Sequence, residues 1–325
     1  MREIQAVRFG GPEVLEAREA PEPVPGAGQA VIEVAAVDTL HIETMIRRGP
    51  ATEWFPTRPP YVPGGGAAGR VAAVGDGVDP GWVGRDVVTI GVANGSYAER
   101  VTADAEALIP VPDGLGVREA AALVHDGLTA LGVAEPSAPR AGEFVLITAA
   151  AGGMGVLLVQ LARAAGARVI GAARGERKLR LLRDLGAELA VDYTEPGWDD
   201  AVRSATDGRG VDVLWDGAGG EIGRAAFGLA ADGARVSAHG APGGGFTATD
   251  PAEAERRGIT LRGIADLQVT PRAAVPRAGR ALALAAAGEI RPVIGRTFPL
   301  DQAAAAHAAI ESREVLGKTL LLVRP

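Results

Sequence analysis

The chain has 325 residues, 47% of them hydrophobic and 22% charged, with a net charge of −7. The acidic balance argues against a broad nucleic-acid or anionic-membrane surface, because both need clustered basic residues. Cysteine is absent, which excludes disulfides and any Cys-ligated zinc or iron–sulfur site. The N-terminus lacks a signal-peptide core and no apolar run reaches membrane-spanning length, so we expect a cytoplasmic protein.

The first third of the chain shows short β-like runs separated by Gly and Pro. Strands are predicted over residues 31–34, 69–74 and 86–90. Many short strands with such turns predict a barrel-like β domain, which we place at residues 1–119.

Helical and β patterns alternate from residue 119 onward. The predicted helices are 119–135, 155–165, 176–185 and 222–230, and the predicted strands are 144–148, 168–172, 189–191, 212–215 and 234–238. This alternation predicts a doubly wound parallel sheet, assigned to residues 120–262. The tail, 263–325, has predicted helices 272–287 and 300–312 and predicted strands 293–298 and 319–323. Its β segments suggest that the chain returns to the first domain.

A glycine-rich turn, Ala149 to Gly155, follows the predicted strand 144–148 and opens a helix. Laid over the G-x-G-x-x-G pattern, it has Ala150 in place of the first glycine, then Gly152 and Gly155. Small residues allow the backbone to approach a pyrophosphate, and the helix N-terminus offers unpaired N–H groups to it. The strand and helix around the turn favour a dinucleotide site over a plain turn.

The residues after the next strand indicate which dinucleotide binds. An NAD site would place an acid there to hold the ribose, but this chain has Arg174, followed by Lys178 one helical turn later. Arginine attracts a 2′-phosphate and can bond it bidentately, so NADPH is favoured. Tyr193 could cover the same pocket. The alternative is that these cations form a solvated helix start.

Residues 142–163, including Gln160 and Arg163, are similar to the signature of the quinone oxidoreductase (zeta-crystallin-like) family of medium-chain dehydrogenase/reductases. Further segments resemble the family at residues 62–75, 95–99, 127–130 and 317–320. The resemblance implies an α/β fold with a GroES-like β-barrel domain, a Rossmann domain and a cleft between them. It also implies NADPH-dependent, metal-free reduction by a homodimer.

The resemblance places additional residues beside the cofactor. Thr129 would lie near the nicotinamide, Gly240 and Ala241 would line the cleft, and Lys318 would approach from the tail; alternatively Lys318 is a surface residue on an edge strand. The full set expected to bind NADPH is Thr129, Ala151, Gly152, Gly153, Met154, Gly155, Arg174, Lys178, Tyr193, Gly217, Gly240, Ala241 and Lys318.

Two segments depart from the family pattern. In the loop predicted around residues 40–49, Leu40 and Glu43 replace the family's Asn and Asp. The family's Pro-Gly-x-Glu becomes Pro63-Gly64-Gly65-Gly66, which we interpret as a turn without the acid. Both departures lie in the substrate-side domain, so they affect the acceptor and leave the cofactor unaffected. His41 and Glu43 are the expected substrate-lining residues.

Catalytic groups are harder to assign. The chain has four histidines and no cysteine, so we expect no metal. Hydride transfer without a Lewis acid suits an acceptor that is already activated, such as a quinone or an α,β-unsaturated carbonyl. His125 and His239 are the candidate proton donors, with polar lining or water as alternatives. Asp216 is expected to be structural or to line the cofactor site, and His307 to be polar cleft lining or a satisfied buried histidine.

Three functions therefore stay open at this stage. The first is a quinone or enone reductase, the second a tailoring enone or enoyl reductase of specialised metabolism. The third is a non-catalytic NADPH-binding protein.

Overall fold

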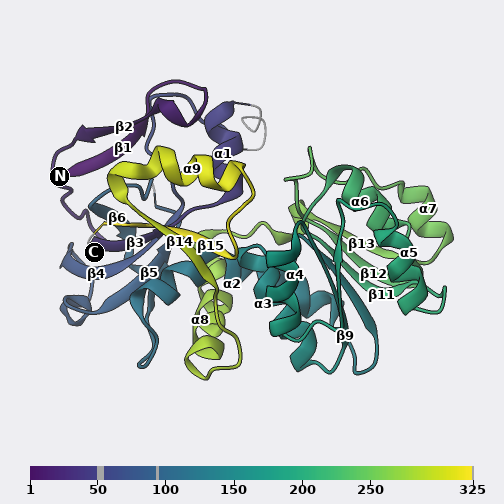
Figure 1. Ribbon diagram of the computed structural model, residues 1–325. Coiled ribbons are helices and arrows are strands. Elements are labelled where there is room, and N and C mark those ends of the chain that lie inside the picture. Colours follow the sequence, from purple (N-terminus) through teal and green to yellow (C-terminus); the bar gives the residue numbers. More distant parts are fainter. Residues whose placement is uncertain (50–54, 93–94, 324–325) are drawn as a thin grey trace. The chain divides into compact units, whose positions relative to one another are not determined.

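The computed structural model describes residues 1–49, 55–92 and 95–323. They form two compact units (Figure 1): unit 1 comprises Met1–Leu128 and Val269–Pro325, and unit 2 comprises Thr129–Gln268. The end of the chain therefore belongs to unit 1. The predicted ranges 1–119, 120–262 and 263–325 have the same discontinuous order, with boundaries nine and six residues earlier.

Unit 1 is built on a 7-stranded sheet with the order β14–β15–β3–β4–β5–β7, in which β6 also pairs with β3. One side of β3 is shared, because its first half pairs with β6 and its end pairs with β15. A separate hairpin joins β1 and β2. The strands are β1 (Arg2–Ala6), β2 (Leu15–Glu19), β3 (Gln29–Asp38), β4 (Gly66–Val74), β5 (Asp86–Ile90), β6 (Arg100–Asp104), β7 (Leu108–Pro110), β14 (Ile294–Pro299) and β15 (Lys318–Leu322).

The helices of unit 1 correct one prediction. Residues 40–49 are not a loop, because α1 (His41–Arg48) forms there. The Leu40 N–H donates to the Glu43 carboxylate at 2.9 Å, which caps the first turn, and Gly49 ends the helix at φ 102°. The other helices are α2 (Val117–Ser137), which continues into unit 2, α8 (Pro271–Ala286) and α9 (Ala303–Glu311).

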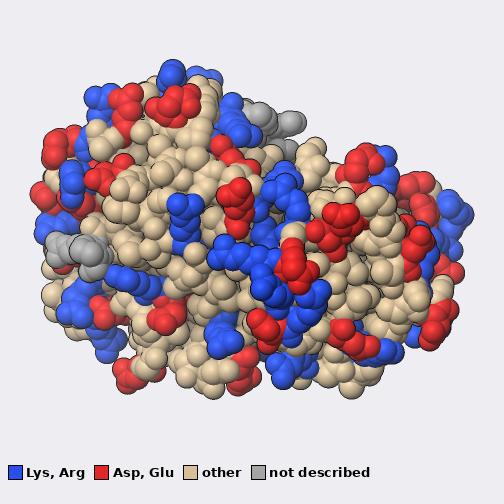
Figure 2. Space-filling view, viewed as in Figure 1, with Lys and Arg blue, Asp and Glu red and all other residues tan. Residues whose placement is uncertain are grey.

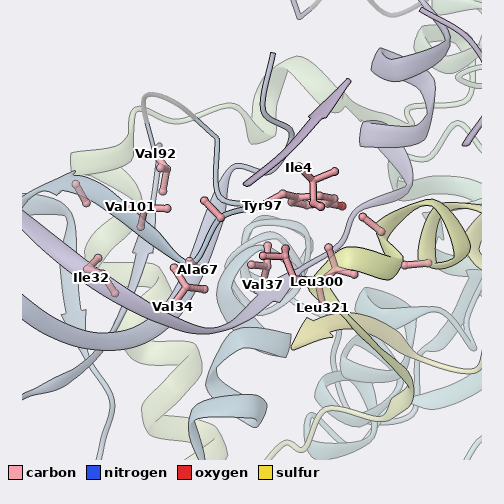
Figure 3. Close-up of a cluster of buried hydrophobic side chains, with 14 of the residues drawn as sticks. Ile4, Ile32, Val34, Val37, Ala67, Val92, Tyr97, Val101, Leu300 and Leu321 are labelled. Atoms are coloured by element: carbon pink, nitrogen blue, oxygen red, sulfur yellow. The ribbon is translucent and has the colours of Figure 1, made fainter. Parts of the chain in front are cut away.

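The core of unit 1 contains side chains from both ends of the chain. Figure 3 shows Ile4, Val37, Leu300 and Leu321 in one cluster of buried side chains. Val37 and Leu321 are register partners across the antiparallel pair β3–β15. Each such buried side chain stabilises the fold by about 1.5–3 kcal/mol, so the tail is an integral part of unit 1.

Unit 2 contains a 6-stranded sheet with the order β10–β9–β8–β11–β12–β13, and all its pairs are parallel. This confirms the doubly wound prediction. The strand order switches direction between β8 and β11, which is where ligands bind in such sheets. The strands are β8 (Phe144–Thr148), β9 (Arg168–Ala173), β10 (Leu189–Asp192), β11 (Val211–Asp216), β12 (Ala230–Ala238) and β13 (Thr260–Gly263).

The helices predicted for unit 2 are present, but two more, over residues 198–205 and 251–256, were not predicted, and one predicted helix end is wrong. The helix predicted over 222–230 ends at Phe227, because Gly228 caps it and β12 begins at Ala230. The helices are α3 (Gly153–Ala164), α4 (Glu176–Asp184), α5 (Trp198–Ala205), α6 (Gly220–Phe227) and α7 (Pro251–Arg256).

On the face drawn in Figure 2, acidic and basic side chains are interspersed and neither sign forms a continuous surface. Among the helices that the structure describes, none combines the length and the apolar character needed to cross a membrane.

Candidate functional site

The turn 149–155 joins the end of β8 to α3 in unit 2. Ala149 adopts φ 50°, and the turn is closed by a bond from the Gly152 N–H to the Ala149 carbonyl at 3.0 Å. Gly152 then caps α3, whose helical residues begin at Gly153. The N–H groups of the first helical turn thus lie at the carboxyl end of the central strand β8, in the arrangement that binds a pyrophosphate.

Two glycines of this turn serve different purposes. A Cβ added to Gly155 would lie 2.5 Å from the Ala149 carbonyl oxygen and 2.6 Å from that of Ala150. Gly155 therefore lets the helix sit against the turn. A Cβ on Gly152 would meet only the Ala149 oxygen, at 3.3 Å. That single tight contact leaves Gly152 less crowded than Gly155.

The predicted 2′-phosphate residues gather where β9 ends and α4 begins. Arg174 is exposed, while Lys178 and Tyr193 are half-buried. The sequence interpretation missed Asp192 at the end of β10, whose carboxylate accepts the Gly175 N–H at 2.7 Å. Burial alone would raise the pKa of Asp192, but its hydrogen bonds to Thr194 and Gly175 and the charge of Arg174 lower it. The loop that carries Arg174 is therefore held by a carboxylate.

A second segment of unit 2 lies beside this turn. A Cβ on Gly217 would lie 3.0 Å from the Thr148 carbonyl oxygen and 3.6 Å from the Ala149 Cβ. A Cβ on Gly240 would lie 1.9 Å from the Gly217 oxygen. The structure therefore brings Gly217 and Gly240 next to the turn 149–155, and Ala241 follows directly.

Asp216 holds this region together, and of its two expected roles, structural or cofactor-lining, its hydrogen bonds favour the structural one. Its Oδ1 accepts the Thr148 hydroxyl at 2.6 Å and the Gly219 N–H at 3.0 Å. Its Oδ2 accepts the Thr247 hydroxyl at 2.5 Å. With its oxygens engaged and only 1% of the residue exposed, the carboxylate is not available to a ligand.

His239 follows β12 in unit 2 and is buried. Its Nδ1 lies 3.0 Å from the Ser237 hydroxyl, and its Nε2 has no hydrogen-bond partner within the described part of the chain. Burial lowers the pKa of His239 to about 4, although the charge of Asp216 opposes this shift. The ring is neutral at neutral pH.

Unit 1 contains a cluster of four ionisable side chains, Asp38, His125, Asp126 and Lys318, which we call the buried quartet. His125 Nδ1 lies 2.8 Å from Asp38 Oδ2. Lys318 Nζ lies 3.5 Å from the same oxygen and 3.1 Å from Asp126 Oδ2. The quartet therefore forms one connected set of charges centred on the ammonium and the Asp38 carboxylate.

Sheet pairing assembles the quartet. Asp38 is the last residue of β3 and Lys318 the first of β15, and Asp38 pairs in register with Leu320. The Thr39 hydroxyl donates to the Thr319 carbonyl at 2.7 Å and holds the two strand ends together. The alternative prediction for Lys318, a surface residue on an edge strand, is wrong. The residue is 3% exposed, and β15 pairs on both sides.

Each charge of the quartet changes the pKa of its neighbours. Burial alone would lower the pKa of His125, but the charge and hydrogen bond of Asp38 outweigh it, and the net shift is upward. Burial also favours neutral Lys318, yet the charges of Asp126 and Asp38 raise its pKa. Burial raises the pKa of Asp126, partly opposed by Lys318. The His125 side chain is 21% exposed, the most accessible of the four.

A neighbouring network in unit 1 involves Glu43. The Tyr97 hydroxyl donates to the Glu43 carboxylate at 2.7 Å, and His307 Nε2 lies 2.9 Å from the same hydroxyl. Burial and the charge of Asp38 raise the pKa of Glu43 to about 7, and burial lowers the pKa of His307 to about 3. Glu43 therefore caps α1 inside the unit, and its expected role as a substrate-lining residue stays a prediction.

Two further predicted positions lie on helices. His41 is half-buried in the first turn of α1, and burial with the charges of Arg313 and Arg48 lowers its pKa. Thr129 is half-buried on α2, one helical turn after His125. Among residues 1–49, 55–92 and 95–323, no group of three or more His, Cys, Asp or Glu side chains is placed to hold a metal ion.

Comparison with known proteins gives matches to both units. The alcohol dehydrogenase GroES-like domain model matches residues 26–113, and the zinc-binding dehydrogenase model matches residues 153–278. The quinone oxidoreductase of Rattus norvegicus is 33% identical over 328 residues, which cover 99% of this chain and 98% of the relative. A 2-haloacrylate reductase of a Burkholderia species is 31% identical over 332 residues, 96% of each chain.

A solved structure gives the same result in three dimensions. The crystal structure of Escherichia coli quinone oxidoreductase complexed with NADPH has a TM-score of 0.91 at 27% identity, covering 99% of this chain and 100% of that one. A GroES-like unit joined to a parallel-sheet nucleotide-binding unit is the architecture of the medium-chain dehydrogenase/reductases. Within that class, the chain belongs to the quinone oxidoreductase family, as the resemblance of residues 142–163 implied.

Proposed function

We propose that this protein is an NADPH-dependent oxidoreductase that transfers hydride to a quinone or an α,β-unsaturated carbonyl compound. The turn 149–155, with Arg174 at the end of the next strand, is the observation that carries the proposal. The full-length similarity to a quinone oxidoreductase solved with NADPH supports it.

The residues of unit 2 fit this cofactor. The space beside Gly152 and the first N–H groups of α3 suit the pyrophosphate. The cations of Arg174 and Lys178 suit the 2′-phosphate. The Asp192 carboxylate lies close enough to offset part of the positive charge of Arg174. Thr129, Tyr193, Gly217, Gly240 and Ala241 complete the proposed cofactor set. When bound, NADPH supplies a hydride to the acceptor.

The acceptor class follows from the chemistry available to the chain. A chain without cysteine cannot hold a Cys-bound Lewis acid, so we propose metal-free reduction. Such a reaction suits an acceptor whose reduced form is stabilised by conjugation. The protein's part is then to orient the acceptor and to supply one proton.

His125 fits the role of proton donor better than His239. Asp38 holds the His125 Nδ1 and raises the pKa of the ring, so the ring is ready to give a proton from Nε2. The pKa of His239 is lowered to about 4, which leaves it without an acidic proton at neutral pH. We therefore propose His125 as the donor.

The test is NADPH oxidation with a panel of quinones, enones and halogenated acrylates, and NADH as the competing reductant. Turnover of at least one acceptor, faster with NADPH, is the expected result. NADPH binding without turnover of any acceptor would instead favour the non-catalytic protein. Preference for acrylates over quinones would favour an alkene reductase, as the similarity to a 2-haloacrylate reductase suggests. A homodimer is proposed as well, to be measured by light scattering.

A further inference from the structure

The buried quartet contains four ionisable groups whose charges can cancel. Two carboxylates and one ammonium leave a net charge of −1, which becomes zero when His125 is protonated. Asp38 and Lys318 are buried almost completely, at 0% and 3% exposed, while the side chains of His125 and Asp126 are 21% and 14% exposed. Burying an uncompensated charge is costly, whereas a neutral and mutually bonded set is tolerated. Electroneutrality therefore favours the imidazolium form of His125.

We propose that Lys318 and Asp126 are positioning residues that act on the protonation of His125 in opposite directions. Asp126 offsets the ammonium and so favours the imidazolium, whereas Lys318 opposes it and binds the Asp38 carboxylate that holds Nδ1, which leaves the outer nitrogen available as a proton donor. This inference rests on the proposed reductase function. It gives Lys318 a role different from the expected cofactor contact. Its ammonium is already engaged by two carboxylates inside unit 1.

The ring orientation supports this assignment. Because Nδ1 is bonded to Asp38, Nε2 is the nitrogen left for a ligand. A Cβ on Gly66 would lie 2.8 Å from the ring's Cε1 and 2.7 Å from Val124, and one on Gly65 would lie 3.4 Å from Nε2. The family's acid at position 66 is thus replaced by glycine where His125 needs the room.

The shifts within unit 1 agree with the geometry. The groups that act on His125 are Asp38 from β3, Lys318 from β15 and Glu43 from α1. Both carboxylates raise the pKa of His125, and Lys318 lowers it. Asp126 also interacts directly with the charge of His125, and it offsets the ammonium of Lys318 beside it.

The proton and electron balance is closed. NADPH gives a hydride, which carries two electrons, and His125 gives the proton from Nε2, so the acceptor gains two hydrogen atoms and NADP⁺ remains. The quartet then carries one negative charge. That charge draws a proton from solvent back to the ring and restores the neutral set.

The experiment is an NMR titration of histidine-labelled protein, with the signal of His125 identified among the four histidines by its loss in His125→Gln. Asp126→Asn leaves the quartet with an excess positive charge and should lower the pKa of His125 by about one unit. Lys318→Met should raise it by about one unit. The double variant should return the midpoint close to that of the unaltered protein. Arg70→Met, which removes one cation from an exposed ion pair of unit 1, is the matched control and should not move it.

The midpoint of the kcat–pH profile should move in the same directions as the pKa of His125 in the titration.

The proposal is overturned if the pKa of His125 is unshifted in the single variants, or if it shifts in the same direction in both. If Lys318→Met raises the KM for NADPH and the double variant does not lower it again, Lys318 contacts the cofactor and the proposal is wrong. The titration needs neither NADPH nor an acceptor. If the pKa of His125 shifts as expected but the protein reduces no acceptor, the proposed function and the donor role are contradicted. The electrostatic coupling within the quartet is then still supported. If Lys318→Met does not fold, Asp126→Asn and the double variant still show whether the pKa of His125 moves in the expected direction.

Discussion

In unit 2 the turn 149–155 is one uninterrupted segment, whereas in unit 1 the buried quartet takes its four residues from β3, α2 and β15. The turn consists of small, uncharged residues, and at Gly155 the absence of a side chain lets the helix lie against the carbonyls of Ala149 and Ala150. The quartet works through charged side chains, which are largely withdrawn from solvent and balanced against one another.

The difference shows how each region can be disrupted. The proposed function of the turn 149–155 should tolerate substitutions elsewhere in the chain, but a side chain added within the turn should disrupt it. A charge cluster depends on every member, because removing one leaves its partners unpaired in a medium of low dielectric constant. Substitutions in the turn should therefore change affinity, and those in the quartet should change pH dependence.

The largest effect is expected from Gly152→Val in the turn. The added Cβ would have one tight contact, 3.3 Å from the Ala149 carbonyl oxygen, and the side chain would occupy the proposed approach of the pyrophosphate. Losing two charge-assisted hydrogen bonds predicts an NADPH dissociation constant raised at least about 100-fold. Gly263→Val is the control, because no heavy atom lies within 4 Å of the added Cβ. Unchanged affinity, measured by fluorescence titration, would mean that the turn does not bind the cofactor.

The second effect concerns the quartet. His125→Gln should lower kcat by roughly 100-fold or more, as expected for loss of a general acid. The donor must be protonated, and the pKa of His125 is raised from 6.5. We therefore expect kcat to fall as the pH rises through this raised pKa. This limb should vanish in the variant. The same substitution at His239 is the competing test, and a larger loss there would reverse the assignment.

A smaller effect is expected at the 2′-phosphate. Arg174→Glu removes a charge-assisted bond and adds a like charge, which predicts a loss of NADPH affinity of roughly 10- to 100-fold. NADH binding should change far less. Arg180→Glu, exposed on the same helix α4, gives the same net charge change and serves as control. Equal loss of both cofactors would contradict the phosphate assignment.

The smallest effect concerns stability beside the quartet. Glu43 has a pKa raised from 4.5 to about 7, so its contribution to stability is fully present below pH 4.5 and is lost as the pH rises towards 7. Glu43→Gln should abolish this dependence, which amounts to roughly 3 kcal/mol in the free energy of unfolding. Urea unfolding at pH 4.5 and 8 measures it. Parallel losses in both proteins would show that Glu43 is not the titrating group.

The sequence predicted unit 2 better than unit 1. Strand 144–148 and the turn after it were located correctly, because the hydrophobic run and the glycines are adjacent in the chain. The helix at 41–48 was taken for a loop, since its cap is a Glu43 carboxylate bonded to the Leu40 N–H, outside the common Ser, Thr, Asp and Asn pattern. Asp192 was missed because its function, holding Gly175, appears only once β9 and β10 are paired.

The sequence of neighbouring residues was enough to predict the family, the parallel sheet and the position of the proposed phosphate-binding turn, because each depends on residues close together in the chain. Only the tertiary structure decided the environment of His125 and Lys318. Asp38 and Lys318 are 280 positions apart and meet because β3 and β15 pair in one register. Burial strengthens the interactions between these charges, and burial is a property of the folded unit.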